Sequence, residues 1–396
     1  MPSLDYYFCI KARFLLMTKP VFRADHCGSL IRPAKLRKAR VDRLHGQIND
    51  AELKTIEDEA ILDVLKMQRN AGIQIYSDGE FRRAFWLSAI SDKFFHGFED
   101  RGIDYARYPT LVGKSIADRE EFVPQVPVVV DKLKAKGRIT GDEIKFLKRH
   151  SPGTFKMTLP SPVTLAPTQY RAGISDRVYS TWQDFFDDFT RLMAEEVKGI
   201  VDDGVTYVQI DAPGYSRFIV PERLKDQVLD RGLDPKYELE LVLAAENKLL
   251  RAAKRHGVTV AVHICLGTYI LGPQGPLGAA ASSYAAPTVG RIIDALEADT
   301  FLIEYSERSG SLESLRDVPK HKTISLGLIN IRDPRVETVD ELMRKLETAS
   351  KFVPMENLSI CPNCGFSGAG ADAWIDESTQ RRKLDVLVET ARRAWH

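Results

Sequence analysis

Short apolar segments of strand length alternate along this chain with longer amphipathic segments of helical period. Helical patterns occupy about 181–203, 237–256, 288–297, 337–351 and 377–395. Strands joined by helices run parallel, and eight of them can close into a ring. The pattern therefore predicts an α/β fold, a (β/α)8 TIM barrel, with reactive groups at the carboxyl ends of its strands. The eight expected strands lie at 22–25, 73–76, 155–159, 207–210, 258–265, 301–305, 323–329 and 358–361.

One stretch, 85–153, is too long for a simple crossover between strands. Its aromatic start and charged, proline-interrupted remainder predict an insertion after the second strand, packed over the barrel mouth as a lid. The glycine-rich run 271–278 follows the expected strand 258–265. It is expected to form a loop beside the candidate functional site at the end of that strand. Residues 1–16 lack the features of a signal peptide and are expected to be a disordered extension. We thus predict a single catalytic domain over 17–396.

Composition narrows the classes of function. The 396 residues are 44% hydrophobic, enough for one large core, and 56 Lys and Arg nearly balance 55 Asp and Glu. Such a balance offers no basic surface for nucleic acid, so small molecules are the expected partners. No apolar run reaches the roughly 18 residues that span a bilayer. Five cysteines, an odd number, favour a reducing, cytoplasmic location over a disulfide framework. A homo-oligomer is compatible with the sequence.

The expected strand 258–265 ends in His263-Ile-Cys265, whose first and last side chains share one strand face. Glu304 ends the next expected strand and Cys364 follows the last one. All four should converge at one face of the barrel, where they could form a tetrahedral zinc (Zn²⁺) shell. Taken singly, each has a plainer interpretation: a core histidine, inert buried thiols, or a carboxylate in an ion pair. Their convergence makes metal binding the favoured hypothesis.

These motifs resemble the catalytic barrel of cobalamin-independent methionine synthase and its single-barrel relatives. The resemblance covers the chain from about residue 20 to its end. In that family the matching positions are zinc ligands, which implies this role for His263, Cys265, Glu304 and Cys364. Cys361 falls outside the pattern and is expected to be a packing residue. The matching motifs are His263-Ile-Cys265, Ile303-Glu304 and Pro362-Asn-Cys364-Gly365.

The resemblance also implies a substrate site. The segment around Ser29 resembles a turn whose backbone N–H groups receive an amino-acid carboxylate. Glu80 and Asp211 match acidic residues that bind the amino group, and Asp211 is also predicted to take part in catalysis. Without the resemblance, Ser29 would be a turn residue and the two carboxylates would be charges at the barrel rim.

The chain departs from the family pattern at three points. It matches one barrel, whereas the full-length synthase has a second, N-terminal one. Ala212 replaces the glutamate of an Asp-Glu-Pro motif, and Arg332 replaces a histidine proposed to protonate the departing folate. These differences leave thiol activation intact and leave the methyl donor open.

The expected function is zinc-dependent methyl transfer from a 5-methyltetrahydrofolate-type donor to homocysteine, giving methionine. This is the activity of a 5-methyltetrahydropteroyltriglutamate–homocysteine S-methyltransferase. The first alternative is alkylation of another thiol, as in an enzyme resembling epoxyalkane:coenzyme M transferase. A decarboxylase resembling uroporphyrinogen decarboxylase would share the barrel but need no His-x-Cys pair. A structural zinc protein with a closed shell is the non-enzymatic alternative.

Overall fold

The structure is a computed structural model, and it describes residues 21–84, 86, 93–100, 127–220, 224–225, 228–229, 234–265, 286–305, 312–367 and 373–395. The predicted extension 1–16 and the glycine-rich run 271–278 lie outside the described residues. Most of the predicted strands and helices lie within them.

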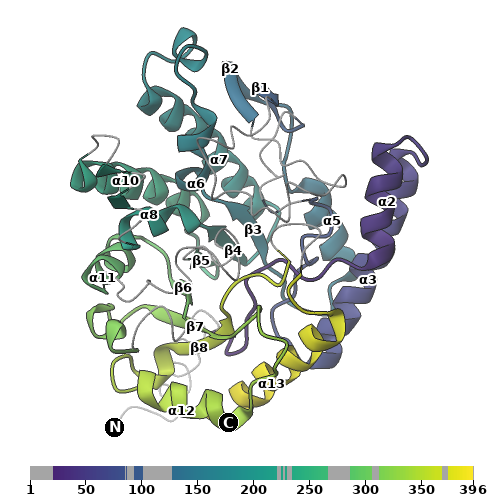
Figure 1. Ribbon diagram of the computed structural model, residues 1–396, viewed down its shortest axis with the longest axis vertical. Helices are drawn as coiled ribbons and strands as arrows, with labels where there is room; N and C mark the ends of the chain where they lie inside the picture. The colour runs from purple at the N-terminus through teal and green to yellow at the C-terminus, as the bar shows by residue number, and fades with distance from the viewer. Residues whose placement is uncertain are drawn as a thin grey trace, which may run out of the picture.

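Six parallel strands, hydrogen-bonded in the order of the chain, form the central sheet (Figure 1). Their side chains are buried almost throughout, as expected for parallel strands covered by helices on the outside and packed on one another inside. The strands are β3 (Met157–Pro160), β4 (Tyr207–Asp211), β5 (Thr259–Ile264), β6 (Thr300–Glu304), β7 (Thr323–Ile329) and β8 (Leu358–Pro362).

The first two predicted strands are each reduced to one bridge. Ala24 pairs in parallel with Ile360 of β8, and Tyr76 pairs in parallel with Phe155 just before β3. These bridges extend the sheet at both ends in the order expected of a closed barrel. The second segment stays short because the side-chain amide of Gln68 bonds both the N–H and the C=O of Ser77, at 3.0 and 2.8 Å. A side chain thus takes the place of a neighbouring strand.

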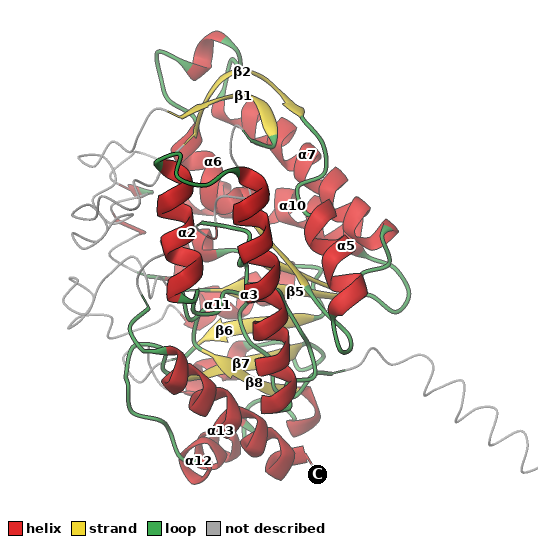
Figure 2. Cartoon of the chain, turned by 90° about the vertical axis from the view of Figure 1, so that its right-hand side faces the viewer, coloured by secondary structure: helices red, strands yellow, loops and turns green. Residues whose placement is uncertain are grey.

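Helices cover the outer face of this sheet (Figures 1 and 2). The sequence specifies their ends: Asn49 and Glu52 form a capping box at the start of α3, and Gly72 ends it in the left-handed conformation. No helix within the described ranges is both long and apolar enough to cross a membrane. The helices are α2 (Ala34–Leu44), α3 (Asp50–Ala71), α5 (Gly141–His150), α6 (Pro162–Gln169), α7 (Trp182–Asp202), α8 (Ser216–Ile219), α10 (Pro235–Ala253), α11 (Ala286–Ala295), α12 (Val339–Ala349) and α13 (Glu377–Trp395).

The described part of the 85–153 stretch contains an antiparallel pair, β1 (Phe95–Asp100) and β2 (Pro127–Ala135), followed by α5. The ring of Phe95 meets that of Phe189 on α7 edge-on at 6.0 Å, and Phe98 meets the same ring at 6.0 Å. This aromatic cluster fixes the pair on the outer helical layer (Figure 2). The predicted lid stays a prediction, since 87–92 and 101–126 lie outside the described residues.

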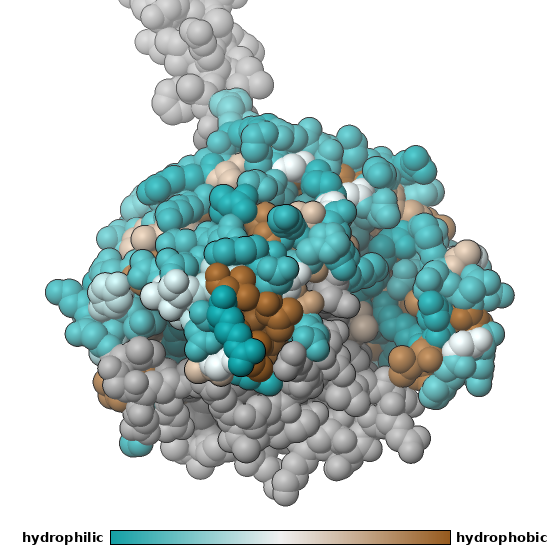
Figure 3. Space-filling view, turned by 90° about the horizontal axis from the view of Figure 1, so that it is seen from above, coloured by the Kyte–Doolittle hydropathy of each residue, from teal (hydrophilic) through white to brown (hydrophobic). Residues whose placement is uncertain are grey.

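The face seen in Figure 3 is mostly polar where it is described, with small apolar groups between the polar ones. Large exposed apolar side chains are scattered along the described chain, which is ordinary for a protein surface. They are Val21, Leu44, Leu62, Leu229 and Tyr237. The compatibility with a homo-oligomer therefore remains a prediction.

A buried carboxyl group on α10 should make stability depend on pH. Glu246 is 1% exposed, Ser161 donates to its Oε2, and its Oε1 has no hydrogen-bond partner. Burial raises the pKa of Glu246 from 4.5 to about 7. A raised pKa means that the folded state binds more protons than the unfolded state between these values, so stability falls as pH rises through this window.

We therefore expect Glu246→Gln to flatten the pH dependence of unfolding. Between pH 5 and pH 8 the wild-type protein should lose about 2 kcal/mol more unfolding free energy than the variant, because glutamine carries no charge to bury. Urea denaturation at both pH values measures this difference. Equal losses in the two proteins would contradict the assignment.

Candidate active site

The predicted metal ligands come together at the carboxyl ends of three strands. His263 lies near the end of β5, Cys265 directly follows it, and Cys364 follows β8. Their ligand atoms all lie within 4.8 Å of one another. The two thiol sulfurs are 3.6 Å apart, and Oε2 of Glu304, at the end of β6, is 3.4 Å from the Cys265 sulfur. All four side chains are buried, so this cluster is enclosed by the protein.

The imidazole of His263 is oriented for coordination. Its Nδ1 is 3.1 Å from Oδ1 of Asp211, and because a carboxylate only accepts, Nδ1 carries the proton. In the neutral imidazole Nε2 then has a free lone pair, and this atom is buried without a hydrogen-bond partner. Buried ring nitrogens are ordinarily satisfied, and a carboxylate on the other nitrogen is the usual support of a metal-bound histidine. The orphaned Nε2 and the nearby thiols therefore fit a metal ion.

The electrostatics of the cluster favour a cation. The hydrogen bond with Cys265, burial, and the charges of Cys265 and Glu304 raise the pKa of the Cys364 thiol well above its ordinary value. Three acidic groups crowded together resist ionisation, and a divalent cation removes that resistance because it stabilises all of the anionic forms. Two sulfurs, an imidazole and a carboxylate are donors that zinc prefers.

The other two described thiols are engaged elsewhere. Cys361 donates to the Ser325 carbonyl at 3.6 Å, and Cys27 donates to the Pro362 carbonyl at 3.2 Å. Both are buried and reduced. Neither belongs to the group of ligand atoms formed by His263, Cys265 and Cys364. The packing role predicted for Cys361 agrees with these contacts.

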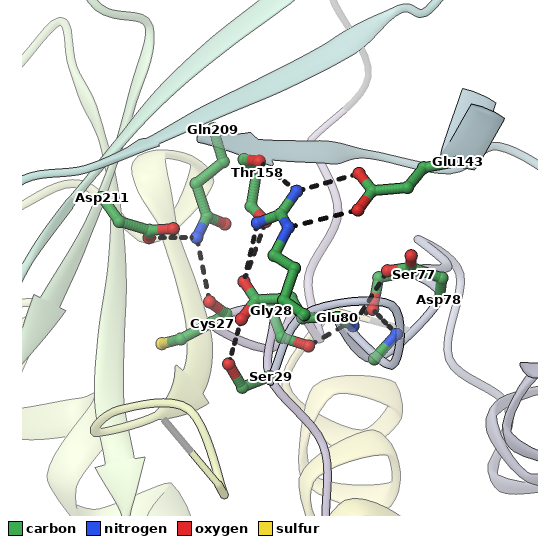
Figure 4. Close-up of polar contacts among 12 residues, drawn as sticks. Cys27, Gly28, Ser29, Ser77, Asp78, Glu80, Glu143, Thr158, Gln209 and Asp211 are labelled. Atoms are coloured by element: carbon green, nitrogen blue, oxygen red, sulfur yellow. Dashed lines mark hydrogen bonds and ion pairs between the residues drawn. The ribbon is translucent and has the colours of Figure 1, made fainter. Parts of the chain in front are cut away.

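Ser29 and Glu80 lie side by side, with their side chains in contact (Figure 4). The Ser29 hydroxyl donates to Oε2 of Glu80, and the Thr158 hydroxyl donates to Oε1 at 2.8 Å. Glu80 has a φ of 61°, the one positive value of a non-glycine residue in the described chain. Backbone in this region is strained and is typical of functional positions. The structure thus holds this buried carboxylate at a fixed place next to the Ser29 turn.

Asp211 approaches the same turn from the other side. Gln209 donates from Nε2 to Oδ1 of Asp211 at 2.7 Å and to the Cys27 carbonyl at 3.0 Å. Segment 27–29 is therefore flanked by both carboxylates, Glu80 through Ser29 and Asp211 through Gln209 (Figure 4). Two buried carboxylates beside one turn could bind an ammonium group.

Sequence reasoning missed three charged or polar residues that support these carboxylates. Nη1 of Arg83 lies 3.6 Å from Oε1 of Glu80, and Nη2 of Arg83 forms an ion pair with Oε2 of Glu143 at 3.0 Å. Gln209 and Lys156 are buried in the barrel interior. One signal was available: Gln209 interrupts an apolar strand two residues before Asp211, so both side chains share one face.

Gly28 leaves room for the Glu80 carboxylate. Its φ is 114°, and a Cβ at this position would lie 2.9 Å from Oε1 of Glu80 and 3.1 Å from Cγ2 of Thr158. We expect Gly28→Ala to lower stability by about 1–3 kcal/mol through backbone strain and to displace Glu80. Thermal unfolding and homocysteine titration would measure the two effects. Unchanged stability and binding would contradict this account of the turn.

Arg332 lies in the loop after β7. Its guanidinium carbon is 5.8 Å from the ring centroid of Trp374, and the neighbouring Ile331 N–H donates to Asn363, next to Cys364. The backbone of this loop is thus linked to the residue next to Cys364, one of the candidate metal ligands. A guanidinium does not give up its proton in proteins, so Arg332 cannot act as the acid expected of a histidine here.

The comparison with known families decides the affiliation of the chain. A family described as "Cobalamin-independent synthase, Catalytic domain" matches residues 24–392. The chain belongs to this family. The resemblance stated from the motifs is therefore confirmed, and the family match covers nearly the whole chain.

Two curated relatives and one solved structure illustrate the similarity. The uncharacterized protein YxjG of Bacillus subtilis (strain 168) is 29% identical over 398 residues, covering 95% of this chain and 96% of YxjG. A methionine synthase of Pyrococcus abyssi is 23% identical, covering 95% and 94%. A B12-independent methionine synthase from Shewanella sp. W3-18-1, solved with selenomethionine, superposes with a TM-score of 0.69 at 23% identity, covering 94% and 98%. This structural likeness confirms the TIM-barrel-type fold.

Membership in this methionine synthase-like family supports a methyltransferase enzyme with a thiol substrate and a methyl donor. The His263, Cys265 and Cys364 cluster could bind a metal ion.

Proposed function

We propose that this protein is a zinc-dependent methyltransferase that moves a methyl group from a 5-methyltetrahydrofolate-type donor to homocysteine and so forms methionine. One observation carries the proposal. The orphaned Nε2 of His263 lies in a buried group with two thiols, and Asp211, the carboxylate that orients this ring, also flanks the 27–29 turn. The metal site and the amino-acid site would thus be adjacent and would share Asp211.

The metal would be held by His263, Cys265 and Cys364, with Glu304 as the fourth ligand. When bound, zinc supplies the positive charge that keeps a substrate thiol deprotonated at neutral pH, where a free thiol with a pKa near 8.5 is mostly protonated. A carboxylate is the ligand most readily replaced by an incoming sulfur. Asp211 supports the site from behind by keeping the proton of His263 on Nδ1.

The amino-acid part of homocysteine would lie over the 27–29 turn. Backbone N–H groups near Ser29 would receive its carboxylate, and Glu80 and Asp211 would pair with its ammonium group. Both side chains are almost fully buried, at 2% and 7% exposed, so these ion pairs would form away from bulk water. This grip would fix the sulfur in one position for attack.

Methyl transfer is a single displacement. The homocysteine sulfur forms a bond to the methyl carbon while the bond from that carbon to the donor nitrogen breaks. The nitrogen keeps the electron pair and takes up a proton. Because Arg332 keeps its own proton, another acid, water included, supplies it.

Turnover with a panel of thiols tests the proposal. Zinc-loaded protein would be incubated with homocysteine, coenzyme M or 2-mercaptoethanol, and in each case with 5-methyltetrahydrofolate, as mono- and polyglutamate, or with an epoxyalkane. Mass spectrometry would follow the methylated products. We expect methionine as the main product. Alkylation of coenzyme M by an epoxide, with no methyl transfer to homocysteine from either donor, would instead support the epoxyalkane transferase alternative and overturn the proposal.

A further inference from the structure

We infer that Gln209 is a positioning residue that makes the site selective for a thiol carrying an amino-acid head group. The inference rests on the proposed function, because it concerns how Asp211 and the 27–29 turn would hold homocysteine. Gln209 is fully buried in β4, and its side chain lies between these two parts of the site (Figure 4).

The amide of Gln209 ties the two recognition elements together. Nε2 donates one hydrogen to Oδ1 of Asp211 at 2.7 Å and the other to the carbonyl of Cys27 at 3.0 Å. Both acceptors belong to segments expected to contact the substrate, one for its ammonium and one for its carboxylate. The separation of the two elements is thereby set by one side chain.

Lys156 fixes which way this amide faces. Its Nζ lies 2.7 Å from Oε1 of Gln209 and 2.8 Å from Oδ1 of Asp25, and its side chain is fully buried. An ammonium group can only donate, so Oε1 must face Lys156. A flipped amide would turn its NH₂ toward Lys156 and its oxygen toward two acceptors. Asp25 is held in turn by the Tyr207 hydroxyl at 2.8 Å.

The fixed amide in turn fixes the carboxylate of Asp211. Oδ1 accepts hydrogen bonds from Nε2 of Gln209 and from the Nδ1–H of His263, whereas Oδ2 has no hydrogen bond to any described residue. The two hydrogen bonds set the plane of the carboxylate and leave Oδ2 for a cation. Loss of the Gln209 donor would free Asp211 to rotate and would release the Cys27 carbonyl. Recognition of the head group should suffer more than binding of a thiol to the metal.

Two variants of similar shape test this role. Gln209→Glu replaces the donor with an acceptor, and Gln209→Met removes all hydrogen bonding. Thr259→Val is the matched control, because Thr259 lies buried at the far end of β5 and its hydroxyl has no partner. Zinc affinity is measured by chelator competition. Calorimetry on the zinc-loaded proteins gives the Kd of homocysteine and of 2-mercaptoethanol, which lacks both charged groups.

We expect homocysteine affinity to fall about 10- to 100-fold in both Gln209 variants, while 2-mercaptoethanol affinity changes less than about threefold and the control matches the wild type. If the wild type binds homocysteine and either Gln209 variant binds it equally well, the inference is wrong and the proposed function stands. An equal loss for both thiols would also overturn the inference, since it would indicate general damage. A wild type that binds neither thiol would overturn the proposed function itself.

Discussion

Cys364→Ser should abolish metal binding and methyl transfer while the barrel stays folded. The variant removes one of the three ligand atoms that lie within 4.8 Å of one another. A serine hydroxyl is not ionised at neutral pH and is a poor ligand for a soft metal. Metal catalysis contributes several kcal/mol to such reactions, so we expect kcat to fall by at least about 10³-fold. Metal analysis and turnover with homocysteine measure the two losses.

Cys361→Ser is the control for this experiment. Cys361 is also buried, lies three residues earlier in β8, and donates to the Ser325 carbonyl, which a serine hydroxyl can also do. Its variant should keep the metal and retain activity within about threefold of the wild type, since its sulfur is not among the clustered ligand atoms. Equal metal loss in both variants would contradict the assignment of Cys364.

Asp211→Asn should impair both halves of the site. The amide would place an NH₂ group where Oδ2 is expected to meet the substrate ammonium, and it would weaken the support of His263. Removing one partner of a buried charge pair costs about 2–5 kcal/mol, so kcat/KM for homocysteine should fall about 10²- to 10³-fold. Zinc affinity should fall about 10-fold. Steady-state kinetics and chelator competition measure these effects.

Asp340→Asn is the control for Asp211→Asn, because it makes the same substitution at a carboxylate away from the site. Asp340 is exposed on α12 and pairs with Arg393, and exposed ion pairs contribute little. It should behave as the wild type in both measurements. If Asp211→Asn kept full affinity for homocysteine, the ammonium-binding role of Asp211 would be wrong even if the zinc affinity dropped.

Local sequence patterns predicted much of the barrel. Strands β4 to β8 are buried apolar runs, and their expected positions agree with the structure to within a few residues. The expected strands 22–25 and 73–76 each form only one bridge. This reduction was not foreseen, because it depends on contacts such as that of Gln68 with Ser77, which joins a helix to the segment after it. The antiparallel pair β1 and β2 was also missed. The pair is held in place by the packing of Phe95 and Phe98 on Phe189 of α7, a residue that lies more than 90 positions later in the chain.

The part of the site that could be predicted consists of reactive side chains at the ends of predicted strands. His263 and Cys265 share a strand face by spacing alone, and Cys364 joins them because parallel strands end at one side of a barrel. The supporting residues were not predictable in this way. Lys156 and Gln209 look like isolated polar interruptions of apolar strands. Only the parallel pairing of β3 with β4 shows that Nζ of Lys156 and Oε1 of Gln209 lie 2.7 Å apart.

The most direct test of the account is zinc content together with zinc-edge X-ray absorption of the purified protein, with and without homocysteine. We predict about one zinc ion per chain, bound by sulfur and by nitrogen or oxygen, and a shell that gains one sulfur when homocysteine is added. Protein without zinc, or a zinc shell that no thiol alters, would contradict thiol activation at this site.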